Sequence, residues 1–151
     1  MSFRLLLENE PIVVVEIREA LSDEDLTALN DLCTREMRRQ CANNIRTVVI
    51  LEISRVQFMS HRQRRIVGEW RAEVRELTRQ VSAGMVMVVT SPLLRSVLTS
   101  INWFQREPIP LAFLKSFDEA VKWAIARCET AGVEVAFPIR ERLLTQVDPN
   151  V

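Results

Sequence analysis

The chain contains 151 residues, of which 48% are hydrophobic and 26% are charged, and its 20 basic and 20 acidic side chains give a formal net charge of zero. The length suits a single domain, and the composition excludes the intrinsically disordered class. A balanced charge gives the chain as a whole no long-range attraction to nucleic acid.

Two short apolar runs near the N-terminus predict a β-hairpin. Residues 3–7 and 12–17 have the composition of strands, and the break between them runs from Glu8 to Pro11. A break this short favours antiparallel pairing. The first run is far shorter than a membrane-spanning helix, so the sequence predicts no membrane insertion.

A helix is predicted after the hairpin, beginning at the sequence LSDED. Ser22 is a suitable N-cap, and the acidic residues 23–25 favour the positive end of a helix. Apolar residues then recur at helical spacing, at Leu26, Leu29, Cys33, Met37 and Cys41. The three cysteines of the chain form no CxxC pair, which predicts reduced thiols and a cytoplasmic protein.

Two continuous apolar runs, residues 46–53 and 85–89, predict central parallel strands of a buried sheet. Between them a second helix is predicted to begin at Ser60, because Gln63 three residues later completes a capping box. The apolar stripe of this helix extends to Val81, and Gly84 is expected to stop it.

The rest of the chain predicts two more helices and a weaker strand. SPLLRSVLTSINWF is expected to form a short helix, and Pro108 and Pro110 push the following strand towards a sheet edge. Ser116 and Glu119 form a second capping box, and Gly132 ends the helix that follows.

The order of these elements predicts an α/β fold with a mixed, mostly parallel sheet, an N-terminal antiparallel hairpin and about four helices. Residues 1–132 form the expected domain, and residues 133–151 form a C-terminal extension with a strand-like segment at 133–137 and a short helix after Pro138. A helix this short needs its apolar side buried, on its own domain or on a second copy. We expect a contact between copies, which predicts a homo-oligomer formed through residues 133–151.

The junction between the central strand and the second helix, VQFMSHRQRR, resembles a motif of the STAS domain. In that family an apolar strand leads into a phrase close to Phe-Met-Asp-Ser-Ser-Gly-Leu at the start of the second helix. The matching residues here are Phe58, Met59, Ser60, His61, Arg62, Gln63 and Arg64. The later segments SPLLRSVLTSINWF and PIPLAFLKSFDEAVKWA resemble more narrowly the SpoIIAA-like bacterial proteins, and the resemblance covers about residues 3–131.

The resemblance implies a STAS/SpoIIAA-like fold and a protein that acts by binding another protein. In the family a partner kinase phosphorylates the second serine of the phrase, but this chain has Arg62 there, so that phosphorylation site is absent. Gln63 replaces the glycine, which makes close approach by a partner's backbone harder. We therefore expect a non-enzymatic protein–protein interaction module in a bacterial regulatory or scaffolding assembly, with a partner-binding surface at Ser60, His61 and Arg62.

Each residue of this surface has a simpler interpretation as well. Ser60 is either a plain N-cap or a phosphorylation site. His61 is either an exposed first-turn residue or a general base; no second histidine or activated nucleophile accompanies it, so the sequence predicts no enzyme. The arginines of this helix alternate with glutamates and lack stacking aromatics, which argues against nucleic-acid binding.

Trp103 and Phe104 suggest an alternative function. These aromatics end the third helix beside a loop and either pack in the core or line a pocket. A pocket there would make the chain a carrier or sensor of a small apolar ligand or lipid, in line with the likeness drawn between this fold and the CRAL-TRIO lipid carriers. Neither function needs a cofactor, and the sequence has no glycine-rich phosphate loop and no metal-ligand spacing.

Overall fold

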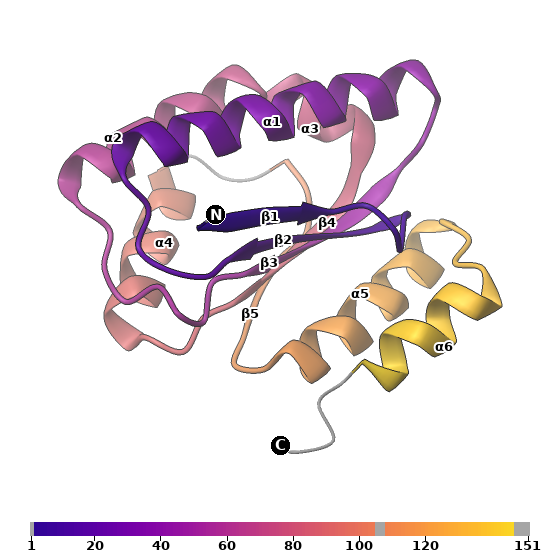
Figure 1. The fold of residues 1–151 in the computed structure, drawn as a ribbon. Coiled ribbons are helices and arrows are strands. Elements are labelled where there is room, and N and C mark those ends of the chain that lie inside the picture. The colour runs from indigo at the N-terminus through magenta and orange to yellow at the C-terminus, as the bar shows by residue number, and fades with distance from the viewer. Residues whose placement is uncertain (1, 105–107, 147–151) are drawn as a thin grey trace.

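The computed structural model of the chain describes residues 2–104 and 108–146, apart from the side chains of Trp103 and Phe104. Within these residues a five-stranded mixed sheet lies between two layers of helices (Figure 1). The strands follow one another across the sheet in chain order: β1 Phe3–Leu6, β2 Ile12–Ile17, β3 Thr47–Glu52, β4 Ser82–Val88 and β5 Leu111–Leu114.

The sheet confirms the predicted α/β fold with its N-terminal hairpin. β1 pairs antiparallel with β2, with Phe3 opposite Ile17, and the other neighbouring strands are parallel. β3 is the middle strand and β4 lies beside it, which fits their continuous apolar sequences because both of their faces are covered by helices. β5 forms the edge, as the prolines before it predicted.

The helices are distributed unequally over the two faces of the sheet. Figure 1 shows α1, α2 and α3 over one face and α5 and α6 over the other. Because the parallel strands advance across the sheet in one direction, right-handed crossovers place the helices that connect them on one face. The helices of the described residues are α1 Asp23–Ala42, α2 His61–Glu73, α3 Arg75–Val81, α4 Pro92–Phe104, α5 Phe117–Ala131 and α6 Phe137–Thr145.

The face beneath α5 is closely packed. Val48, Ile50 and Val86 of the sheet and Val121 and Ala124 of α5 have no exposed surface. Alternate residues of each strand point to opposite faces, so this core takes one half of the apolar residues in β3 and β4. The other half faces α1 to α4.

Gly84 belongs to this packed face, and the prediction that it stops the second helix is wrong. It lies inside β4. A Cβ at residue 84 would lie 2.9 Å from Cγ of Arg127 and 3.1 Å from Cη2 of Trp123. A glycine in a strand interior often marks such a close approach, and here α5 is the approaching element.

The second predicted helix is interrupted at Val74, so it forms two helices rather than one. The backbone of Val74 has φ −95° and ψ 9°, outside the α-helical range, and α3 begins at the next residue. The side chain of Val74 is buried, and α3 packs against α1, where Thr78 Oγ1 lies 3.9 Å from Met37 Sδ. The apolar spacing continues unbroken across residue 74, which is why the sequence did not indicate the break.

The C-terminal extension differs from expectation in its first part. Residues 133–136 form no strand, and α6 begins at Phe137 with Pro138 in its first turn. Proline is tolerated there because the N–H groups of the first turn have no acceptor within the helix. Leu143 is fully buried in the α5-side core, with Ile139 packed beside it. The extension therefore packs part of its apolar side chains on its own domain, while Phe137 is exposed. Self-association through residues 133–151 stays a prediction, and residues 147–151 lie outside the described part of the chain.

Candidate functional site

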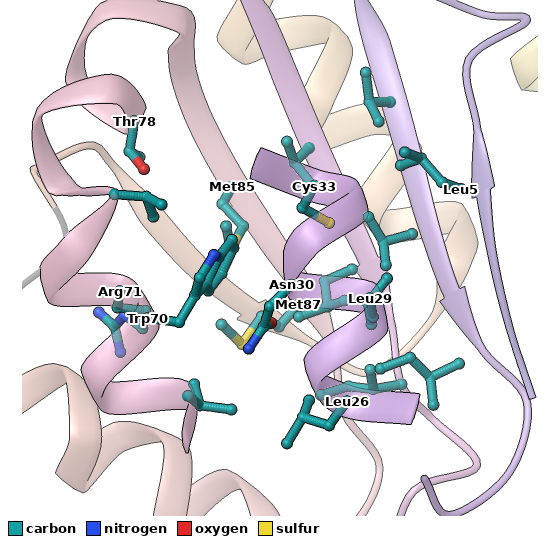
Figure 2. A pocket seen from close by; sticks show the side chains of 18 of the residues that line it. Leu5, Leu26, Leu29, Asn30, Cys33, Trp70, Arg71, Thr78, Met85 and Met87 are labelled. Carbon is teal, nitrogen blue, oxygen red and sulfur yellow. The ribbon is translucent and has the colours of Figure 1, made fainter. Parts of the chain in front are cut away.

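A cavity of about 200 Å³ lies between the sheet and the helices α1, α2 and α3 (Figure 2). We call it the sheet–helix cavity. Its floor is the face of the sheet opposite to α5, and its walls are the inner faces of these three helices together with Leu94 and Leu98 of α4. The principal lining residues are apolar: Leu5, Val13, Val15, Ile17, Leu26, Leu29, Cys33, Met37, Val49, Leu51, Val67, Trp70, Val74, Val81, Met85, Met87, Leu94 and Leu98.

The strands supply the floor through their two-residue period. Val15 of β2, Val49 and Leu51 of β3, and Met85 and Met87 of β4 all point to the same face. The two methionines lie two residues apart on β4, and both line the cavity. Methionine side chains are flexible and adapt to irregular space, so this part of the floor can adjust its shape to an occupant.

Helix α1 covers the cavity with one stripe of its surface. Leu26, Leu29, Asn30, Cys33 and Met37 follow the i, i+3, i+4, i+7 pattern of a single helical face, and all of them line the cavity. The helix is fixed at its start by Ser22, whose Oγ accepts a hydrogen bond from the backbone N–H of Asp25 at 3.0 Å. Asn30 is the one polar residue among the five.

Helix α2 forms a looser wall. None of its residues is buried, although Val67 and Trp70 are apolar and face inward. The indole of Trp70 is held in place because its Nε1–H donates to Thr34 Oγ1 of α1 at 2.9 Å, which ties α2 to α1 across the top of the cavity.

The cavity reaches the surface beside the junction that resembles the STAS motif. Phe58 lines the cavity and is nevertheless 67% exposed. Met59 and Gln63 line the same end. Gln63 Nε2 donates to the carbonyl oxygen of Leu21 at 2.7 Å, so the first turn of α2 is tied to the loop before α1. The entrance is therefore framed by the junction and by this loop.

The three predicted partner-binding residues lie next to this entrance but do not line the cavity. Ser60 is the N-cap of α2, as predicted: its Oγ accepts from the backbone N–H of Gln63 at 3.0 Å, and Gln63 Oε1 accepts from the backbone N–H of Ser60 at 3.2 Å. His61 and Arg62 are exposed on the first turn. Arg62 Nε lies 3.3 Å from Asp23 Oδ2, an exposed ion pair that contributes little to stability.

The proposed pocket at Trp103 and Phe104 falls on side chains that lie outside the described residues. The sheet–helix cavity is lined by other residues, among them Trp70 and Asn30. Trp70 belongs to the apolar stripe of the second predicted helix, and such a stripe has the same spacing whether it packs in a core or lines a void. Asn30 carried a usable signal, because a polar residue four positions after Leu26 stands inside the apolar stripe of α1.

The thiol in the cavity is held in its neutral form. Burial and, to a smaller extent, the negative charge of Glu36 raise the pKa of Cys33 to about 12. The thiolate is the nucleophilic form of cysteine, so at neutral pH Cys33 acts as a small apolar wall residue. Within the described residues, no group of three or more His, Cys, Asp or Glu side chains is placed to hold a metal ion.

Comparisons with known proteins place the chain in no family. No family model, no curated protein and no solved structure matches it. The resemblance to the STAS domain therefore stays a prediction. Among the helices of the described residues, none combines the length and apolar character that crossing a membrane requires.

Proposed function

We propose that this chain binds a small apolar molecule in the sheet–helix cavity. This is the carrier or sensor function that the sequence suggested, but at a different place from Trp103 and Phe104. The supporting observation is a cavity of about 200 Å³ with mostly apolar walls. Protein interiors normally contain few voids larger than a water molecule, and an unfilled apolar void forfeits dispersion contacts along its whole lining.

The volume limits the size of the ligand. An apolar cavity of roughly 150 Å³ lined by Leu, Ile and Phe binds benzene. The present cavity of about 200 Å³ accordingly suits one substituted aromatic ring or a short branched hydrocarbon. The opening beside Phe58 gives such a molecule a path from solvent, and a longer chain would have to extend through it.

Protein–protein interaction remains a second candidate, and the exposed apolar residues near the junction support it. Phe58 is 67% exposed and Leu93, at the start of α4, is 62% exposed. Their two loops are joined because Thr90 Oγ1 donates to the carbonyl oxygen of Ser54 at 2.8 Å. Both functions are non-catalytic and need no cofactor, and the free cysteines fit a cytoplasmic location.

Filling the cavity tests the proposed function. We expect 1,4-dimethylbenzene to bind the purified chain saturably in calorimetric titration. Cys33→Phe places a ring in the cavity, since Cys33 lines it midway along α1, and should reduce the affinity at least tenfold. The same variant should keep or raise the melting temperature, because its ring replaces void with packed atoms.

Cys41→Phe is the matched control. It introduces the same side chain on the same helix at a position that does not line the cavity, so 1,4-dimethylbenzene should bind this variant as it binds the unmodified chain. Absence of saturable binding to the unmodified chain, or equal binding to Cys33→Phe, would contradict the proposed function.

A further inference from the structure

Two buried amides of α1, Asn30 and Gln40, line the sheet–helix cavity, and neither side chain makes a hydrogen bond to another group of the described residues. Asn30 is 7% exposed and lines the cavity. Its backbone carbonyl accepts a hydrogen bond from Thr34 Oγ1 at 2.9 Å, but within the described residues its side-chain amide makes no hydrogen bond to another protein group. Figure 2 shows this amide pointing from α1 into the cavity, on the side of Trp70 and Met87.

Buried polar groups in native proteins are nearly always paired, and each exception calls for an explanation. An amide at residue 30 is not needed to form α1, since leucine is the better helix former. Nor does the packing demand it, because the nearest neighbours of Asn30 on this face, Leu26, Leu29 and Cys33, are apolar. The placement fits the general design of ligand sites, which are mostly apolar with a few polar groups that fix orientation.

We infer that Asn30 selects ligands that carry one uncharged hydrogen-bonding group, a hydroxyl or a carbonyl, on an otherwise apolar body. This inference rests on the proposed function and names its ligand class. A side-chain amide both donates and accepts, so it pairs with either group. The ring or chain of the ligand would then lie among Trp70, Met85 and Met87.

The charges around the cavity argue for a neutral group. Two charged residues contribute to its lining, and both are engaged elsewhere: Glu36 accepts from Arg39 Nε at 2.7 Å, and Arg71 donates to Asn102 Oδ1 at 3.2 Å. A carboxylate at Asn30 would lie against the apolar side chains of Leu26, Leu29 and Cys33 on the same helix. Burying an isolated charge is far more costly than burying a hydroxyl.

A pair of probes of equal size tests the inference. 4-Methylphenol and 1,4-dimethylbenzene differ only in a hydroxyl that replaces a methyl group. We expect Asn30→Leu to lower the affinity for 4-methylphenol relative to that for 1,4-dimethylbenzene by about tenfold, the loss that one neutral hydrogen bond produces. A general change in cavity shape would alter both affinities alike, so the ratio of the two affinities isolates the effect of the hydroxyl group.

Gln40→Leu is the matched control. Gln40 is a second buried amide of α1 that lines the cavity, but it lies ten residues further along, about 15 Å at the helical rise. A one-ring probe that contacts Asn30 cannot reach it, so Gln40→Leu should leave the affinity ratio unchanged. Asn30→Ala, which removes the amide without adding bulk, should shift the ratio in the same direction as Asn30→Leu.

The outcomes separate this inference from the function on which it rests. If both probes bind and Asn30→Leu leaves their affinity ratio unchanged, Asn30 does not select the ligand, while the cavity remains a binding site. A shift in Gln40→Leu instead of Asn30→Leu would also overturn it. If neither probe binds the unmodified chain, the proposed function fails and this inference fails with it.

Discussion

At the scale of single residues, Gly84 and Asn30 mark the two ways in which helices meet the sheet: by close contact on one face and around a cavity on the other. Gly84 stands where α5 comes closest to the sheet. Asn30 lies on the opposite side of the sheet, where it lines the cavity between α1 and the strands. The sequence identified Gly84 as a glycine of structural consequence but assigned it to a helix end, because a glycine after an apolar stripe is the usual stop signal.

Gly84→Ala should lower the free energy of unfolding by about 1–3 kcal/mol, the usual range for overpacking a core. The new methyl group would lie 2.9 Å from Arg127 Cγ, and Arg127 cannot move freely because its Nε donates to the carbonyl oxygen of Ala83 at 2.8 Å. Urea denaturation measures the effect. In an Arg127→Ala background the same substitution should cost less; an equal cost in both backgrounds would show that this contact is not responsible.

At the scale of elements, capping patterns predicted helix starts well. Ser22, Ser60 and Ser116 each accept a hydrogen bond from the backbone N–H three residues later, because a local cap depends only on nearby residues. Helix ends and breaks were predicted less well. The interruption at Val74 depends on how α3 packs against α1, and no pattern within the helix carries that information.

Ser60→Ala should lower the free energy of unfolding by about 0.5–2 kcal/mol, because it leaves the backbone N–H of Gln63 without its cap. Thermal denaturation measures the loss. Ser60→Asp is the matched control: aspartate also caps helices and places a negative charge at the positive end, so most of the stability should return. If both variants lose the same stability, the side chain of Ser60 does not act as the cap.

At the scale of the whole molecule, the alternation of apolar runs and amphipathic helices was enough to predict the mixed sheet. It could not predict the cavity, because Leu29, Val49 and Met87 have the same sequence pattern whether they touch across the layer or line a void. For the extension, the sequence left open whether its short helix is buried on its own domain or on a second copy, and Leu143 is buried on its own domain.

Leu143→Ala should therefore lower the free energy of unfolding by about 2–5 kcal/mol, as for other fully buried leucines. Phe137→Ala is the control on the same helix; Phe137 is 72% exposed, so its truncation should have little effect on stability. Chemical denaturation and sedimentation together test this. If Phe137→Ala instead reduces the mass of the particle in solution, the outer side of α6 forms the contact between copies that the sequence suggested.

The order of the strands also has a consequence for how the chain folds during its synthesis. Because the sheet is built strand by strand in chain order, each crossover helix covers the same face as soon as its strands pair. The opposite face, with Val48, Ile50 and Val86, stays uncovered until α5 and α6 have been made. A nascent chain that ends before residue 117 thus exposes a continuous apolar sheet, the kind of surface that chaperones bind and that promotes aggregation.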